Sequence, residues 1–361
     1  MKPKVTVLMS VYNSERYLRE AIESILNQTF EDFDFLIIND GSTDESRKII
    51  RLYDDARVRL IDNEGNIGLT LSLNKGIALA QGEYLARMDA DDVSLPERLE
   101  TQVKFLNSHP DTALVGSAAL IIDSASHLLE TAYRDISDRL LPTQLFWENC
   151  LVHSSVMGRT SVFQEFQYPE QYAVAQDYWL WTQIAQKYPI ANLAEPLLCS
   201  RRHSDSVTLM HSSRQEAVVK RIFRRQLEHL GLTPLSDTDV ELHYQLLRQQ
   251  FHPKQIAMSQ RYAVLAWILR IVEQHRRNPV YDHAYFSHQL QQNWRRFFDA
   301  RAGYQSGVKG MVLLYKGLAL FPTLEEQCRY LLTCLKPVPL FRRVIPPLTK
   351  LLNLFMRSDK A

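Results

Sequence analysis

The sequence predicts an α/β protein, in which a mainly parallel β-sheet carries helices on both faces and a helical extension follows at the C-terminus. Two observations carry this prediction. Over roughly the first ninety residues, continuously apolar runs alternate with amphipathic segments, which is the pattern of repeated β-α-β units. From about residue 211 the strand signals fade, and basic, aromatic segments with helical spacing replace them. We therefore expect two parts, residues 1–210 and residues 211–361.

The expected strands are short and rich in β-branched residues, as buried parallel strands are. Four lie in the alternating region, at 5–11, 33–40, 58–62 and 83–89, and two further apolar segments follow at 113–123 and 191–203. Because an amphipathic segment separates each of the first four strands from the next, we expect these strands to run parallel, with the helices packed on the sheet.

The expected helices carry signals at their ends. They span 14–28, 42–53, 68–82 and 175–188, with further helices at 217–230, 261–275 and 325–335. Ser42 and Glu45 stand at the spacing of a capping box, which predicts a helix start there. Gly82 closes the third helix, where a glycine is typical of a C-cap.

Composition argues against several classes of protein. The chain has 361 residues, more than one compact core usually holds, and its net charge of +1 gives no indication of nucleic acid binding. The four cysteines, Cys150, Cys199, Cys328 and Cys334, show no zinc or redox spacing. A reduced, cytoplasmic setting is therefore expected.

The sequence shows no signal peptide and no apolar run long enough to span a bilayer. Residues 336–357 mix Lys and Arg with Leu and Phe, which leaves two alternatives. The segment makes a peripheral contact with the inner face of a membrane, or it packs against protein. Pro337, Pro339, Pro346 and Pro347 interrupt any long helix and favour packing.

The most unusual short segment is "DADD", residues 89–92, directly after the fourth expected strand. Ligands of open parallel sheets bind at the carboxyl ends of strands, and two other strand ends, 10–15 and 39–44, are also polar. The chain has no G-x-G-x-x-G turn and no P-loop. A divalent cation held by carboxylates, Mg²⁺ or Mn²⁺, would then supply the positive charge that phosphates need.

Each acid has a plainer explanation when it is considered alone. The "DADD" carboxylates fit a solvated turn and an acidic helix N-terminus before Pro96. Asp40 precedes Gly41, and Asp-Gly is a common turn pair. The functional interpretation therefore rests on the combination of motifs.

The chain resembles the family 2 glycosyltransferases of the GT-A fold in two long segments. These are "VTVLMSVYNSERYLREAIESILNQTFEDFDFLIINDGSTDES" and "NEGNIGLTLSLNKGIALAQGEYLARMDADDVSLPERLE". The resemblance covers about residues 3–205 and is densest over the first 105. It implies a nucleotide-binding GT-A domain with a mixed, mainly parallel sheet.

The resemblance also implies which residues bind the sugar donor. Ser10, Tyr12 and Glu15 match the family's first nucleotide-binding loop and would contact the base and the ribose. Asp40 matches the aspartate that hydrogen-bonds the base, usually uracil or another pyrimidine. Asp89 would lie beside the ribose and the diphosphate. The donor implied is a nucleotide-diphosphate sugar, with UDP as the expected nucleotide.

The metal site follows from the same resemblance. Asp91 would be the direct ligand of Mg²⁺ or Mn²⁺, whereas Asp92 either supports the site or caps a helix. The segment "CSRRHSDSVT" resembles the closing strand and loop of the catalytic domain. Within it, His203 would reach the metal or the diphosphate, or else make a structural hydrogen bond.

The segment "AQDYWLW" resembles the family's Glu-Asp segment, which implies Asp177 as the general base, with Gln176 in place of the common Glu. The plainer alternative for Asp177 is a carboxylate that stabilises the helix dipole. The segment "CLVHSSVMGRT" resembles a His-Pro-Ser-Val-Met segment, with Ser154 in place of the proline. His153 there lines the acceptor pocket or serves a structural role.

These residues together imply a metal-dependent, inverting glycosyltransferase that moves a sugar to a hydroxyl of a glycan or lipid-linked acceptor, in surface polysaccharide synthesis. Inversion follows from one base carboxylate with no second nucleophile. A nucleotidyltransferase is one alternative, but the first strand-to-helix turn lacks the expected glycines. A non-catalytic binding module is the other, although Asp91 and Asp177 are both present.

Overall fold

The computed structural model describes residues 2–132, 138–203, 212–248 and 258–297. The chain divides into two compact units, Met1–Ile222 and Phe223–Ala361. The division between the units falls within helix α9 (Ser212–His229). The functional boundary that we expect between residues 210 and 211 therefore stays a prediction.

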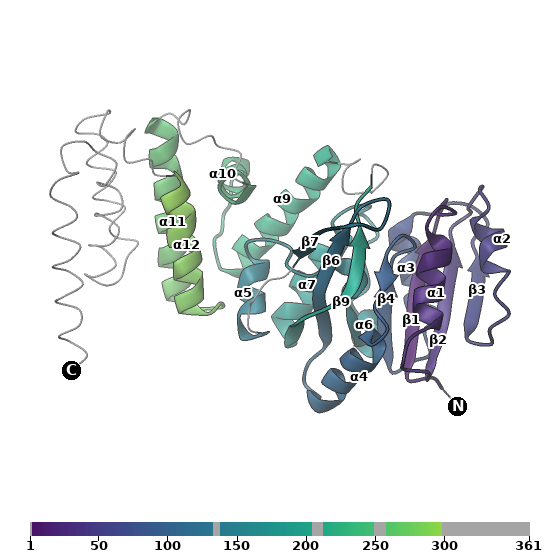
Figure 1. The fold of residues 1–361 in the computed structure, drawn as a ribbon. Coiled ribbons are helices and arrows are strands. Elements are labelled where there is room, and N and C mark those ends of the chain that lie inside the picture. The colour runs from purple at the N-terminus through teal and green to yellow at the C-terminus, as the bar shows by residue number, and fades with distance from the viewer. Residues whose placement is uncertain (1, 133–137, 204–211, 249–257, 298–361) are drawn as a thin grey trace, which may run out of the picture. The chain divides into compact units, whose positions relative to one another are not determined.

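The first unit is built on one mixed sheet (Figure 1). Its strands within the described residues are β1 (Val5–Val11), β2 (Phe33–Asn39), β3 (Val58–Asp62), β4 (Tyr84–Met88), β5 (Val93–Ser94), β6 (Leu114–Ile122), β7 (Leu128–Ala132), β8 (Met157–Arg159) and β9 (Ile190–Arg201). Their order is β3-β2-β1-β4-β8-β6-β9-β5, and β7 pairs with β6. Strands β1 to β4 run parallel, whereas β8 is antiparallel to both β4 and β6. The predicted mixed, mainly parallel sheet is confirmed.

Helices cover both faces of this sheet (Figure 1). They are α1 (Leu18–Leu26), α2 (Ser46–Ile50), α3 (Leu69–Leu79), α4 (Arg98–Ser108), α5 (Leu141–Leu145), α6 (Thr160–Phe166) and α7 (Gln176–Lys187). Alternate residues of β1 face opposite sides, so Val7 and Met9 join the core beneath α1, α2 and α4. On the other side, Leu8 packs so closely on Gly76 of α3 that a Cβ there would lie 2.2 Å from it.

Helix α2 begins four residues later than the sequence predicts. The capping-box prediction is wrong, because Ser42 Oγ accepts a bond from the backbone of Asn13 at 3.1 Å and not from its own segment. Glu45 instead stands at the N-cap position and makes no side-chain cap bond. Ser42 therefore fastens the loop after β1 to the loop after β2, and the helix starts only beyond it.

The C-cap prediction for Gly82 is also wrong. Helix α3 ends at Leu79, with Ala80 in an extended conformation at its C-cap. Gly82 is needed for a different reason: a Cβ there would lie 2.4 Å from the backbone nitrogen of Thr6. The glycine thus lets the chain enter β4 in close contact with β1.

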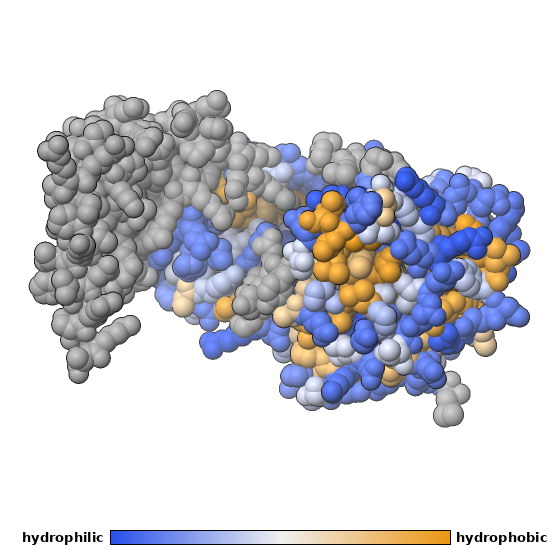
Figure 2. Space-filling model, viewed as in Figure 1, coloured by the Kyte–Doolittle hydropathy of each residue, from blue (hydrophilic) through white to orange (hydrophobic). Residues whose placement is uncertain are grey.

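One face of the first unit exposes apolar side chains around β6 and β7 (Figure 2). Leu128 and Leu129 of β7 are 62% and 52% exposed. The turn before β7 matters more for the site, since it holds Asp123 and Ser126, whose oxygen atoms both accept hydrogen bonds from Arg201 at the end of β9.

The second unit is helical as far as it is described. It contains the end of α9, α10 (Asp237–Arg248), α11 (Met258–Arg277) and α12 (His283–Phe297), around a core that includes Phe223, His243 and Trp267. None of the described helices is long and apolar enough to cross a membrane. The predicted helix at 325–335 and the basic segment at 336–357 lie outside the described residues.

Candidate active site

Three loops meet at the carboxyl ends of β2, β1 and β4, which are neighbours in the sheet. The loop after β1 is joined to the loop after β2, because Asn13 Oδ1 accepts the backbone N–H of Thr43 at 2.8 Å. Asn13 itself has a φ of 47°, a left-handed conformation that asparagine tolerates. The three polar strand ends therefore lie along one edge of the sheet, as the sequence predicts, and the first two are joined directly.

The residues predicted to bind the base and the ribose lie at the ends of β1 and β2 and in the loops that follow them. Ser10 lies half-buried near the end of β1, and Tyr12 is 47% exposed just beyond it. Glu15 is held more firmly: its backbone donates to Asp44 Oδ2 at 3.0 Å, and its carboxylate accepts the N–H of Glu45 at 2.9 Å. Glu15 thus contributes a carboxylate to the start of α2.

Asp40 is 1% exposed and serves the loop that precedes α3. Its Oδ1 accepts the side-chain amide of Asn63 at 2.8 Å and the backbone N–H of Ile67 at 2.9 Å, while Oδ2 accepts the N–H of Gly68 at 2.9 Å. Any contact with a nucleotide base would be made by a carboxylate that also holds residues 63–68 in place. The sequence does not reveal this second role.

We expect Asp40→Asn to lower the melting temperature and to weaken UDP binding. The amide replaces an acceptor oxygen with a donor that faces N–H groups, and a buried unsatisfied group costs about 1–3 kcal/mol. Thermal unfolding and calorimetry with UDP measure the two effects. The exposed Asp54→Asn is the matched control. A stable Asp40→Asn protein with unchanged affinity would contradict this expectation.

The "DADD" segment forms an acidic cluster at the end of β4. One carboxylate oxygen from each of Asp89, Asp91 and Asp92 lies within 4.8 Å of the others. Asp91 also meets His203, whose Nε2 lies 2.9 Å from Asp91 Oδ2. Carboxylate oxygens with an imidazole suit Mg²⁺ or Mn²⁺, so the donor set fits the divalent cation that the sequence predicts.

A buried arginine lies under this cluster. The Arg87 side chain is 1% exposed and forms an ion pair with Asp89. Burial raises the pKa of Asp89, as do the neighbouring Asp91 and Asp177 carboxylates, while Arg87 opposes this rise. Asp177 therefore lies within electrostatic reach of the cluster, although 88 positions separate it from Asp89 in the sequence.

Asp92 differs from the other two acids because it faces the protein interior. It is 3% exposed, Ser154 Oγ donates to Oδ2, and the backbone N–H of Arg201 donates to Oδ1 at 2.8 Å. Burial, followed by repulsion from Asp89 and Asp91, raises the pKa of Asp92 to about 8. These contacts favour the supporting role that the sequence left open for Asp92.

Asp177 lies in the first turn of α7, after Ala175, which adopts a left-handed conformation with a φ of 52°. Burial raises the pKa of the Asp177 carboxyl, whereas the N–H of Tyr178 and the Asn149 side chain lower it. Asn149 Nδ2 donates to Asp177 Oδ2 at 2.8 Å. A partly exposed carboxylate with a raised pKa suits a general base.

We expect Asn149→Ala to move the acid limb of the pH profile of sugar transfer to higher pH. The lost hydrogen bond raises the pKa of Asp177 further, and a base works only when it is unprotonated, so activity is lost first on the acid side. The control is Asn107→Ala, which removes an exposed acceptor of the Tyr84 hydroxyl. An unchanged acid limb in Asn149→Ala would contradict this role.

His153 contacts aromatic residues. Its Nε2 lies 2.8 Å from the Tyr168 hydroxyl, and its ring centroid lies 6.0 Å from that of Trp181. Burial, with a smaller effect of Arg87, lowers the pKa of His153 well below its usual value, so the ring is neutral. These contacts favour the structural alternative for His153.

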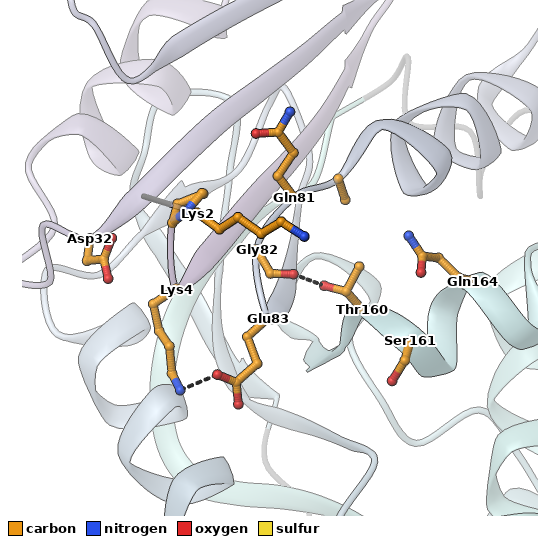
Figure 3. A pocket seen from close by; sticks show the side chains of 11 residues that line it. Lys2, Lys4, Asp32, Gln81, Gly82, Glu83, Thr160, Ser161 and Gln164 are labelled. Carbon is orange, nitrogen blue, oxygen red and sulfur yellow. Dashed lines mark hydrogen bonds and ion pairs between the residues drawn. The ribbon is translucent and has the colours of Figure 1, made fainter.

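A pocket of about 580 Å³ lies at the amino ends of β1 and β4 (Figure 3). Its lining includes Lys4, Glu83 and Thr160, and the first two form an ion pair. The strand from Glu83 to Asp89 spans about 20 Å at the usual rise per residue, so this pocket is remote from the acidic cluster. It belongs to the opposite end of the sheet and not to the candidate active site.

Comparison with known proteins agrees with this geometry. A sequence model described as glycosyl transferase family 2 matches residues 6–166. An uncharacterised glycosyltransferase of Methanocaldococcus jannaschii, MJ1057, is 37% identical over 203 residues, which cover 55% of this chain and 70% of that protein. The chain belongs to glycosyl transferase family 2. It is therefore a glycosyltransferase, and the prediction of the family is confirmed.

A further relative and a solved structure are also similar to this family 2 glycosyltransferase. The amylovoran biosynthesis glycosyltransferase AmsE of Erwinia amylovora is 31% identical over 208 residues, which cover 56% of this chain and 77% of that protein. The S. aureus TarS 1–349 structure with UDP-GlcNAc superposes with a TM-score of 0.56 at 15% identity, covering 84% of this chain and 92% of TarS 1–349. The GT-A fold prediction is confirmed by this likeness.

The sequence missed several residues that shape the site. Asn149 lies in no motif that we used. Arg87 and Arg201 lie within segments that carry the resemblance but were given no role, although Arg201 stands only two positions before the selected His203. Ser154 was noted only as a departure from the family's proline, yet its hydroxyl bonds Asp92. That departure was the one sequence signal available for this contact.

Proposed function

We propose that this family 2 glycosyltransferase is metal-dependent and inverting, and that it moves a sugar from a UDP-sugar to a hydroxyl of a glycan or lipid-linked acceptor. Surface polysaccharide synthesis is the proposed setting, in agreement with the amylovoran biosynthesis of its relative AmsE. The observation that carries the proposal is the 2.9 Å contact of His203 with Asp91, which joins two predicted metal ligands that lie 112 positions apart.

Donor binding would use the carboxyl edge of the sheet, from the end of β2 to the end of β4. Ser10, Tyr12, Glu15 and Asp40 stand around its nucleotide end, and Tyr12 offers an exposed ring to a base. Asp89, Asp91 and His203 stand where the diphosphate would lie, and they would hold Mg²⁺ or Mn²⁺. When bound, the cation would neutralise negative charge on the diphosphate.

The transfer forms one bond, breaks another and moves one proton. Asp177 takes the proton of the acceptor hydroxyl as that oxygen forms a bond to the anomeric carbon. The bond from this carbon to the diphosphate oxygen breaks, and UDP leaves from the opposite face, so the configuration inverts. The raised pKa of Asp177 strengthens it as a base, and its placement near Asp89 brings it toward the donor.

A screen of donor hydrolysis tests this proposal. The full chain is incubated with a panel of nucleotide sugars, with and without Mn²⁺, and release of the nucleoside diphosphate is measured. We expect release from at least one UDP-sugar, dependent on the metal. Hydrolysis of a GDP-sugar alone would contradict the UDP assignment. Equal release of the nucleoside diphosphate with and without Mn²⁺ would contradict metal dependence.

The membrane contact proposed for residues 336–357 has its own test. Co-sedimentation with anionic liposomes compares the full chain with residues 1–335. We expect more of the full chain in the pellet if the basic segment reaches anionic lipid. Equal recovery of the two proteins would remove the peripheral contact from the proposal and leave transfer unaffected.

A further inference from the structure

Arg201, the last residue of β9, places a buried guanidinium behind the acidic cluster. Its side chain is 1% exposed, whereas that of the next residue, Arg202, is 55% exposed and pairs with Glu130. Burial of a charged group is tolerated only when its N–H groups find acceptors. The acceptors of Arg201 therefore show which parts of the site it holds together.

Acceptors from three separate segments surround this guanidinium. Arg201 Nε donates to the backbone carbonyl of Asp91 at 2.9 Å. Its Nη2 pairs with Glu20 of α1 at 2.6 Å. Its Nη1 donates to the carbonyl of Asp123 at 3.2 Å and to Ser126 Oγ at 2.8 Å, both in the turn before β7. One side chain thus joins the acidic loop, α1 and this turn.

The same guanidinium also supports His203. Its central carbon lies 4.5 Å from the centre of the Tyr17 ring, and that ring centre lies 5.2 Å from the His203 ring. His203 Nε2 in turn lies 2.9 Å from Asp91 Oδ2. Arg201 therefore contacts Asp91 directly and His203 through Tyr17, while its own burial keeps it away from a bound donor.

We propose that Arg201 is a positioning residue that sets the separation of Asp91 and His203, and so the affinity of the site for a divalent cation with a nucleotide. This inference rests on the proposed function. A guanidinium is needed because its planar fork serves several acceptors in different directions at once. A lysine ammonium keeps the charge but cannot reach Asp91, Glu20 and Ser126 together.

The test compares Arg201→Lys with a matched arginine. Calorimetry measures UDP binding across a series of Mn²⁺ concentrations, and thermal unfolding is followed in parallel. We expect the Mn²⁺ concentration for half-maximal UDP binding to rise about tenfold in Arg201→Lys. The control is Arg159→Lys, since Arg159 also donates to backbone carbonyls, those of Leu106, Thr112 and His109. The control protein should be less stable than the wild type, but it should need the same Mn²⁺ concentration for half-maximal UDP binding.

A second variant, Glu20→Gln, keeps the test decisive if Arg201→Lys does not fold. The Glu20 side chain is 47% exposed, so its loss is tolerated, and we expect a smaller rise of about threefold in the same direction. A wild-type Mn²⁺ requirement in a folded Arg201→Lys protein, or failing that in Glu20→Gln, overturns the inference. UDP binding by the wild type that needs no Mn²⁺ would instead contradict the proposed function.

Discussion

Asp177→Asn should lower the rate of sugar transfer by about 10²–10⁴-fold and leave nucleotide binding near the wild-type level. The amide cannot take up the acceptor proton, but it has nearly the shape of the carboxylate and can still accept the 2.8 Å bond from Asn149. Steady-state transfer with the donor found by the hydrolysis screen measures the loss, and calorimetry with UDP and Mn²⁺ measures binding.

The control for this substitution is Glu165→Gln. Glu165 lies in α6 and forms a surface ion pair with Lys187, which belongs to α7, the helix that carries Asp177. It should show wild-type turnover, which separates a loss of the base from a general effect of removing a carboxylate near α7. Turnover of Asp177→Asn within a few-fold of the wild type would exclude Asp177 as the base and return it to the helix-dipole role.

Asp91→Ala should abolish the Mn²⁺ dependence of UDP binding and weaken that binding at least tenfold at saturating metal. The substitution removes the carboxylate that meets His203, so the cluster loses a central oxygen ligand. Losing a hydrogen-bonding partner of a charged group alone is worth about a tenfold change in affinity. Calorimetric titration of UDP with and without Mn²⁺ gives both quantities.

The matched control is Asp54→Ala, because Asp54 is an exposed aspartate on the loop before β3. Its Mn²⁺ dependence should equal that of the wild type. Should Asp91→Ala bind UDP with full Mn²⁺ dependence, the metal would have to be held by other groups. In that event Asp89 and His203 would remain the candidates, and Asp91 would lose its assigned role.

The regular elements of the sheet could be predicted because local sequence controls them. The continuous apolar run of β1 was predicted with both of its ends in place, since all of its side chains except the half-buried Ser10 are buried on one face or the other. Strands β5, β7 and β8 were missed. Strands β5 and β8 have two and three residues, too few to show periodicity, and β7 is exposed along almost its whole length, so it shows no alternation of buried and exposed side chains. These strands owe their conformation to pairing with β9 and β6.

The two errors at helix ends have a common physical cause. Ser42 and Gly82 each have a local signature, and in each case a contact with a distant segment replaces the local role. Ser42 bonds Asn13, and Gly82 makes room for the backbone of Thr6. Short-range preferences are worth about 1 kcal/mol, and a tertiary contact of similar strength overrides them.

The sequence alone determined the family, the sheet with its helices, and a short set of acids and a histidine as candidates, because motif spacing and strand periodicity are properties of neighbouring residues. Only the tertiary structure decided how these candidates are used. In the folded chain, Asp92 accepts a hydrogen bond from Ser154 and His203 contacts Asp91. Arg201 donates to the carbonyl of Asp91, and Asn149 donates to Asp177. Such contacts join residues from 28 to 112 positions apart, and no local pattern encodes them.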